Sequence, residues 1–226
     1  MINRRKKTFW LFLFTFLWFS LSFGQHEIDL VDVSTLDSTI IVDLKYATAD
    51  NFMGDTLYSA NICLLRKDVA KRLIDVQKEL RRMGLGLKIW DAYRPLSVQK
   101  KMWQKIHDPR YVADPAKGSN HNRGAAVDVT LVDKSGKELE MPTGFDDFSE
   151  KAGSNYPHAS PEARKNRELL KKVMIKHGFK PISSEWWHFN DKDIKKYSIL
   201  DIPLDIFKRG IKGKEKKWMR KKLEEL

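Results

Sequence analysis

The protein is a chain of 226 residues with a formal charge of +12, 42% hydrophobic residues and a single cysteine. This length and composition are those of a globular protein, and they favour one domain over two. One cysteine excludes both an internal disulfide and a zinc site built from several cysteines.

The first 24 residues have the pattern of a secretory signal peptide. Basic residues at positions 4–7 precede an uncharged run that ends at Gly24, and small residues just before Gln25 predict cleavage there. The alternative is an uncleaved membrane anchor, because the uncharged run is nearly long enough to span a bilayer. Export without disulfides favours the periplasm or the exterior of a bacterium, and the periplasm is expected.

The mature chain opens with a predicted strand and a predicted long helix. Isoleucine and valine at 40–42 predict a strand that ends near Tyr46. Lys67–Met83 is predicted to be a helix that Gly84 closes, since its apolar residues recur every three or four positions. Residues 85–90 then predict a short buried strand, and Arg94 follows its end.

Prolines, glycines and periodic apolar residues divide the rest of the chain. Pro95 is expected in the first turn of a helix, and Ser160 is expected as the N-cap of another, with Pro161 after it. The expected segments are a helix over 96–107, a loop over 108–120, a strand over 125–132, an irregular binding loop over 145–160, a helix over 161–177 and a last strand over 179–189.

Residues 208–226 form a basic tail with nine lysines and arginines against three glutamates. The plain interpretation is a solvated helical tail, and the alternative is a peripheral contact with a membrane or an anionic cell-wall polymer. Nucleic acid is not expected as a partner of an exported protein. The expected organisation is a signal peptide at 1–24, one folded domain at 25–207 and the tail at 208–226.

Two of the six histidines have a carboxylate at short range in the sequence together with small or aromatic neighbours. His121 precedes Asp128 by seven residues across a small-residue turn, and Glu185 precedes His188 by three. Two histidines and one aspartate can hold a catalytic zinc and leave one position for water. A nearby glutamate can activate that water, so the residues predict a zinc peptidase. The alternative is that both histidines are polar core residues with satisfied hydrogen bonds.

Glu185 does not fit a regular strand easily. Residues three apart on a strand point to opposite faces, so Glu185 and His188 reach one metal only if the strand is twisted, bulged or ends there. Glu185 is expected to be the general base, and the alternative is that it supports one of the ligands. Arg94 leaves a buried strand where sites commonly form, and a fixed guanidinium there would stabilise an oxyanion.

Four motifs occur in order along the chain: KYATADNF at 45–52, WDAYRP at 90–95, SNHNRGAAVD at 119–128 and EWWH at 185–188. Together they closely resemble the D-alanyl-D-alanine dipeptidases of the VanX type. The resemblance covers about residues 28 to 205, nearly the whole mature chain. It implies His121, Asp128 and His188 as ligands of one zinc per chain, Glu185 as the catalytic base and Arg94 as the transition-state arginine.

The resemblance also implies substrate-binding residues. Ser119 falls on a serine that contacts the substrate, and Asp146 falls on an acid that receives its free amino group. Tyr46 and Asp91 match positions that line or support the site.

The fold implied is a compact single α+β domain with a central, largely antiparallel sheet flanked by helices, shared with D,D-carboxypeptidases and hedgehog signalling domains. The activity implied is zinc-dependent hydrolysis of D-Ala-D-Ala to two D-alanines in cell-wall peptide turnover, with a small D-amino-acid dipeptide as substrate. One alternative is a D,D-carboxypeptidase or other peptidoglycan peptidase on the same fold. The other is a non-catalytic zinc-containing binding module, against which the presence of Glu185 and Arg94 counts.

Overall fold

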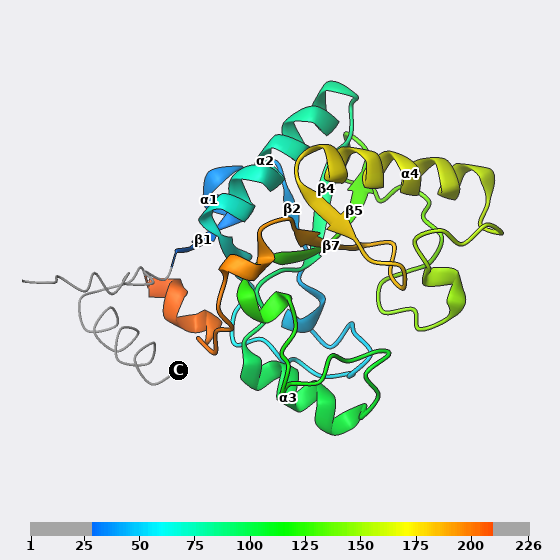
Figure 1. The fold of residues 1–226 in the computed structure, drawn as a ribbon. Helices are drawn as coiled ribbons and strands as arrows, with labels where there is room; N and C mark the ends of the chain where they lie inside the picture. Colours follow the sequence, from blue (N-terminus) through cyan, green and yellow to red (C-terminus); the bar gives the residue numbers. More distant parts are fainter. Residues whose placement is uncertain (1–28, 210–226) are drawn as a thin grey trace, which may run out of the picture.

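The structure is a computed structural model that describes residues 29–209 (Figure 1). The predicted signal peptide and nearly all of the basic tail lie outside the described residues. Within 29–209, no helix is both long and apolar enough to cross a membrane.

A five-stranded sheet occupies the centre of the fold, in the order β2-β4-β5-β7-β6. Only β2 and β4 run parallel, and every other neighbouring pair is antiparallel. The predicted α+β fold with a largely antiparallel sheet is therefore confirmed. The strands are β2 (Ile41–Val42), β4 (Gly86–Asp91), β5 (Ala126–Val132), β6 (Phe179–Pro181) and β7 (His188–Asp191), with β1 (Leu30–Asp32) and β3 (Leu64–Arg66) as a separate antiparallel pair.

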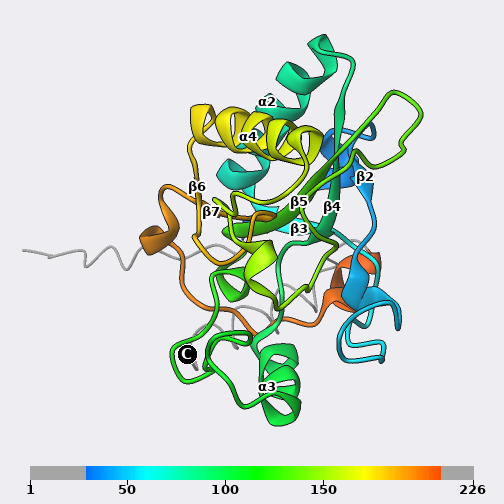
Figure 2. The same ribbon diagram turned by 90° about the vertical axis from the view of Figure 1, so that its right-hand side faces the viewer.

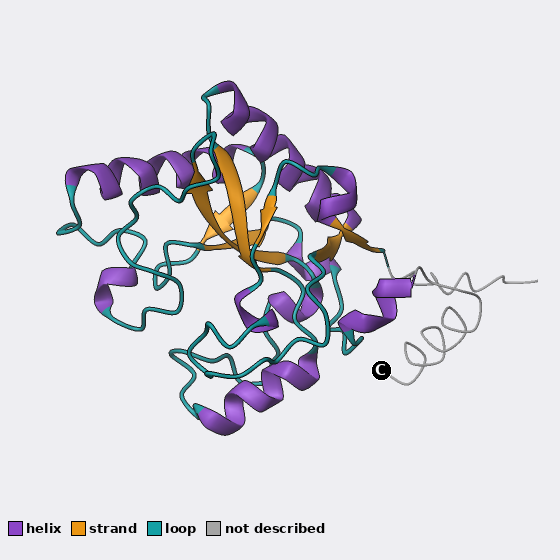
Figure 3. Cartoon of the chain, turned by 180° about the vertical axis from the view of Figure 1, so that it is seen from behind, coloured by secondary structure: helices purple, strands orange, loops and turns teal. Residues whose placement is uncertain are grey.

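Two long helices cover one side of the sheet, and a third lies on the other side. Figure 2 shows α2 (Lys67–Arg82) and α4 (Pro161–Lys176) next to each other above the strands. Viewed from behind in Figure 3, the strands lie between this helical layer and α3 (Leu96–Lys105) with its surrounding loops. The short helices are α1 (Val33–Leu36), η1 (Lys45–Ala47), η2 (His121–Arg123), η3 (Glu150–Ala152), η4 (Ile194–Lys196) and η5 (Leu204–Arg209).

The central strands β4 and β5 are buried on both faces, but the two faces differ in chemistry. Cross-strand pairing aligns apolar side chains on one face, as Ile89 with Val129 and Val127 with Phe189. These residues and the apolar face of α2 belong to one core cluster. Because side chains alternate along a strand, Asp128 points to the opposite face, toward α3 and the loops. The apolar core thus holds the strands in place, and the polar face is left for a site.

The helix predictions were largely correct, and two strand predictions were not. Lys67–Arg82 and Pro161–Lys176 are helical as expected, although Pro95 is the N-cap of α3 rather than its first residue. The first strand is shorter than predicted, because β2 ends at Val42 and the chain then turns into the 3₁₀ helix η1.

The predicted single strand over 179–189 is wrong. It is two strands, β6 and β7, that pair with each other, and Glu185 lies in the connection between them. The backbone of that connection forms hydrogen bonds with residues 152–154. The N–H of Trp186 donates to Ala152 O (2.8 Å), and the N–H of Ser154 donates to Ser183 O (3.0 Å). These bonds to the segment at 152–154 draw the chain out of the sheet.

Candidate active site

Asp128 and His188 are brought together by strand pairing. They are directly opposite residues on β5 and β7, so their side chains leave the sheet on the same face. Nδ1 of His188 lies 3.0 Å from Oδ1 of Asp128. Two residues that are 60 positions apart in the sequence are thus neighbours by register.

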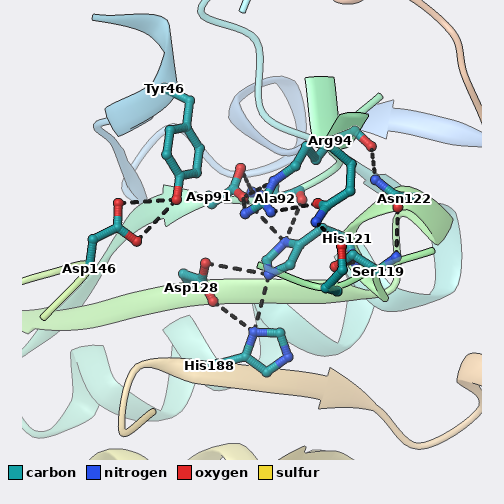
Figure 4. Close-up of polar contacts among 12 residues, drawn as sticks. Tyr46, Asp91, Ala92, Arg94, Ser119, His121, Asn122, Asp128, Asp146 and His188 are labelled. Atoms are coloured by element: carbon teal, nitrogen blue, oxygen red, sulfur yellow. Dashed lines mark hydrogen bonds and ion pairs between the residues drawn. The ribbon is translucent and has the colours of Figure 1, made fainter. Parts of the chain in front are cut away.

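His121 reaches the same point from the 3₁₀ helix η2, just before β5. Gly124 ends this helix with φ +64°, and a Cβ there would lie 2.7 Å from Leu30 Cδ2, so the turn requires glycine. Nε2 of His121 lies 3.1 Å from Nδ1 of His188 and 3.4 Å from Oδ2 of Asp128. Figure 4 shows the three side chains converging, with one donor atom from each within 4.8 Å of the others.

The other nitrogen of each ring faces an oxygen that accepts a hydrogen bond. Nδ1 of His121 lies 2.7 Å from the carbonyl oxygen of Ala92, and Nε2 of His188 lies 2.9 Å from the side-chain oxygen of Asn190. In the neutral rings, these contacts leave the lone pairs on the inner nitrogens, which point toward Asp128. The three inner atoms form a donor set for a cation.

Burial and the neighbouring charges both change the pKa values of Asp128 and His188. Burial acts to lower the pKa of His188, but the hydrogen bond and charge of Asp128, together with Glu185 and Asn190, more than offset it and raise the pKa to about 9. Burial acts to raise the pKa of Asp128, and the neighbouring His121 and His188 reverse this and bring it far below its ordinary value. Asp128 is therefore a carboxylate, ready to act as a ligand.

Glu185 reaches the donor set from the connection before β7. Its Oε2 lies 3.8 Å from Nδ1 of His188. Its backbone oxygen accepts a hydrogen bond from the Ser154 hydroxyl (3.1 Å), and the next residue, Trp186, is fully buried. Burial raises the pKa of Glu185 above its ordinary value, which brings the carboxylate closer to the pH at which a general base works best. The loop therefore resolves how Glu185 and His188 share one side.

Arg94 presents a guanidinium whose orientation is fixed. Its Nη2 donates to Oδ2 of Asp91 (2.6 Å), and its Nη1 donates to Oε1 of Gln99 (2.8 Å). The guanidinium carbon lies 5.0 Å from the centre of the Tyr46 ring. Burial acts to lower the pKa of Arg94, but Asp91 raises it and the net pKa is well above the ordinary value. The side chain is a permanent, oriented cation.

Asp91 lies behind the site rather than at its surface. It is fully buried and accepts hydrogen bonds from Arg94, from the Tyr58 hydroxyl and from the Ala92 N–H. Removing one partner from a buried pair of this kind costs about 3–5 kcal/mol. Asp91 was expected to line or support the site, and its position is that of a support for Arg94.

Tyr46 and Asp146 form a second polar pair in the site. The Tyr46 hydroxyl donates to both carboxylate oxygens of Asp146, at 3.0 and 3.1 Å (Figure 4). Burial raises the pKa of Asp146 to about 7, although the hydrogen bond from Tyr46 lowers it. Asp146 has φ +57°, the one positive φ of a non-glycine residue within 29–209. Backbone conformations of this kind are found at functional sites.

Ser119 lies beside His121 on the same turn. Its Oγ accepts a hydrogen bond from the His121 N–H (3.2 Å), which leaves the hydroxyl proton for another partner. Asn122 holds the turn in place, because it accepts from the Ser119 N–H (2.7 Å) and donates to the carbonyl oxygen of Arg94 (2.8 Å). One buried amide thus links the motif at 119–128 to the motif at 90–95.

These residues share one cavity of about 280 Å³. Eight of the nine sequence-predicted site residues line it, and Asp91 does not: the eight are Tyr46, Arg94, Ser119, His121, Asp128, Asp146, Glu185 and His188. These residues come from segments far apart in the chain, and their convergence on one cavity supports a common function.

Three supporting residues were missed from the sequence: Gln99, Asn122 and Asn190. Asn190 could have been found, since it is two residues after His188 and strand periodicity puts both side chains on one face. Gln99 bonds to the nearby Arg94 and Asn122 bonds to the carbonyl oxygen of Arg94 from another segment, and no sequence pattern indicates either contact.

A His-Asp-His donor set next to a carboxylate and a fixed guanidinium is typical of metal-dependent hydrolases. Comparison with known proteins agrees, because residues 26–203 match the model of peptidase family M15, described as D-Ala-D-Ala dipeptidase. The chain belongs to this family of metallopeptidases.

Curated relatives support the same family. The chain is 42% identical over 179 residues to the D-alanyl-D-alanine dipeptidase of Escherichia coli K12, covering 79% of this chain and 93% of that protein. It is 32% identical to the D-alanyl-D-alanine dipeptidase of Streptomyces coelicolor, covering 73% and 92%. Among solved structures, VanYB in complex with D-Ala-D-Ala matches at 16% identity and a TM-score of 0.40, covering 62% of this chain and 77% of that one.

Proposed function

We propose that this protein is a zinc-dependent dipeptidase that hydrolyses D-Ala-D-Ala to two D-alanines, with one zinc per chain. The family match and the 42% identity to a D-alanyl-D-alanine dipeptidase support the reaction. The observation that carries the residue roles is the convergence of the His-Asp-His set, Glu185 and Arg94 on one cavity.

The donor set fits zinc. Two imidazole nitrogens and one carboxylate oxygen are the ligand types that catalytic zinc sites use, with a fourth position left for water or substrate. The outer nitrogens of His121 and His188 contact accepting oxygens, so the inner nitrogens, beside Asp128, are the ones left to bind an ion. A zinc ion bound here would supply Lewis-acid chemistry, since it polarises a carbonyl and makes a water molecule more acidic.

Glu185 acts as general base and then as general acid. Its carboxylate takes a proton from the attacking water as the new C–O bond forms at the scissile carbonyl carbon. It passes that proton to the leaving nitrogen as the C–N bond breaks, so one water is consumed and two amino acids are released. The Arg94 guanidinium donates to the oxygen that becomes negative in the tetrahedral intermediate.

Asp146 and Tyr46 account for the size of the substrate. The Asp146 carboxylate binds the free ammonium of the dipeptide, and Tyr46 keeps that carboxylate in place by donating to both of its oxygens. The Ser119 hydroxyl has a proton to donate to the substrate. A peptide with a blocked amino group would leave Asp146 buried without a cation, which is costly.

The test compares three substrates with the purified, zinc-loaded protein: D-Ala-D-Ala, L-Ala-D-Ala and N-acetyl-D-Ala-D-Ala. We expect D-alanine release from the first and at least a hundredfold lower kcat/KM for the acetylated one. Comparable hydrolysis of the acetylated substrate would instead indicate a D,D-carboxypeptidase. Bound zinc without hydrolysis of any of the three would indicate a binding module.

We also propose that the chain is exported to the periplasm and cleaved before Gln25. The basic residues at 4–7 and the uncharged run after them support export. An exported dipeptidase suits the recycling or nutritional use of D-alanine from cell-wall peptides. N-terminal sequencing of the protein from a periplasmic fraction tests this: a chain that begins at Met1 in the membrane fraction would mean an uncleaved anchor.

A further inference from the structure

The side chain of Asn190 lies next to the donor set and bridges the two segments that carry its histidines. Its Oδ1 lies 2.9 Å from Nε2 of His188 and 2.9 Å from Nδ2 of Asn120. Asn120 directly precedes His121, and His188 is two residues before Asn190 on β7. One amide oxygen therefore contacts both ligand-bearing segments.

This contact determines which nitrogen of His188 carries the proton. An amide oxygen only accepts hydrogen bonds, so Nε2 must be protonated to bond with it. In the neutral ring the lone pair is then on Nδ1, which lies 3.0 Å from Asp128 and 3.1 Å from Nε2 of His121. The carbonyl oxygen of Ala92 has the same effect on His121. One ligand is thus oriented by the backbone and the other by a side chain that can be changed.

We infer that Asn190 is the positioning residue that orients His188 for zinc and, through Asn120, holds the two ligand segments together, so that it sets the zinc affinity of the site. This rests on the zinc site of the proposed function. The strand itself does not need the amide, because the backbone of Asn190 is already paired with Ala126 and Lys180 on either side. Partners of this kind change metal affinity by about 10- to 100-fold when removed.

Three variants of the full chain separate this role from others. Asn190→Leu has the same shape without an acceptor, Asn190→Asp keeps the acceptor, and Asn190→Ala covers the case in which leucine disturbs folding. The first measurement is the zinc dissociation constant of each metal-free protein against a competing chelator, without substrate. Thermal unfolding of the metal-free proteins shows whether each variant folds.

We expect Asn190→Leu and Asn190→Ala to weaken zinc binding about 10- to 100-fold, and Asn190→Asp to keep it within a few-fold of wild type. In the zinc-loaded wild type, the ring ¹⁵N shifts of His188 should show a proton on Nε2 that bonds to an acceptor, and the leucine variant should lose that bond.

Unchanged zinc affinity in the leucine and alanine variants would overturn the inference. A raised KM with unchanged zinc affinity would also overturn it, and would make Asn190 a substrate contact, since it lines the cavity. If wild type itself binds no zinc, the proposed function fails and the inference fails with it. Zinc binding by wild type with equal affinity in all variants refutes the inference alone.

Discussion

Nε2 of His121 and Nδ1 of His188 lie 3.1 Å apart, and the other nitrogen of each ring contacts an accepting oxygen. In the neutral rings two lone pairs therefore face each other beside the Asp128 carboxylate. Such an arrangement needs a positive charge at its centre, which a proton on His188, with its pKa of about 9, supplies without metal and a bound zinc would supply in its place. The register of β5 and β7 therefore brings these side chains together in a site that favours metal binding.

Removal of the metal should consequently lower the stability of the fold. A ligand at 100 to 1,000 times its dissociation constant stabilises a protein by about 3–4 kcal/mol, which for a domain of this size lowers Tm by roughly 10 °C when it is removed. Thermal unfolding before and after chelation measures this. Zinc should restore the Tm and magnesium should not, because imidazole ligands suit zinc. An unchanged Tm after complete zinc removal would contradict the role of the ion.

Glu185→Gln should abolish most of the turnover and leave the zinc bound. The amide cannot accept the water proton, so we expect kcat to fall about 10²- to 10⁴-fold. Zinc content by elemental analysis and kcat for D-Ala-D-Ala are the two measurements. Glu150→Gln, an exposed residue of η3, is the control and should keep wild-type activity. Near wild-type kcat in Glu185→Gln would refute its role as base.

The pH dependence of kcat/KM should report Asp146. Its pKa is about 7, so the carboxylate is charged above that pH and neutral below it. Ammonium binding needs the charged form, and kcat/KM should therefore fall as the pH drops below about 7. Tyr46→Phe removes a hydrogen bond that favours the charged form, so the fall should move to higher pH. Asp146→Asn should raise KM, and its kcat/KM should no longer show this fall at low pH.

A shift of this fall to lower pH in Tyr46→Phe would contradict this assignment. So would a normal profile in Asp146→Asn, because another group would then be responsible for the acid limb.

Arg94→Lys should reduce kcat more than it changes KM. Lysine keeps the charge but cannot bond to Asp91 and Gln99 in the same fixed geometry. Loss of one oxyanion donor lowers kcat about 10²- to 10³-fold. Steady-state kinetics measure both parameters, and Arg164→Lys on the exposed face of α4 serves as the control. A raised KM with unchanged kcat would assign Arg94 to substrate binding instead.

The sequence predicted the parts of this site that depend on local pattern. Apolar periodicity located α2 and α4, and motif order indicated the residues that line the cavity. Prediction from local pattern failed where hydrogen bonds between distant segments determine the path of the chain. Residues 182–187 have strand-like composition, but the backbones of Ser183 and Trp186 bond to the segment at 152–154, and this places Glu185 in a loop.

Supporting residues were the hardest to predict. Asp91 belongs to a recognisable motif, yet only the structure shows that it is buried behind Arg94. Gln99 joins Arg94 to the carbonyl oxygen of Ala113, a contact between residues with no shared pattern. The identity of a ligand can be read from spacing and chemistry, whereas its orientation depends on partners that only the fold brings into contact, as Ala92 with His121.

A zinc titration of the metal-free protein with D-Ala-D-Ala as substrate tests the single catalytic zinc most directly. D-Alanine release should be absent without zinc, rise linearly as zinc is added and stop rising at one zinc per chain, with two D-alanines formed per dipeptide. Equal hydrolysis by the zinc-free protein, or a break at a ratio other than one, would contradict a single catalytic zinc held by His121, Asp128 and His188.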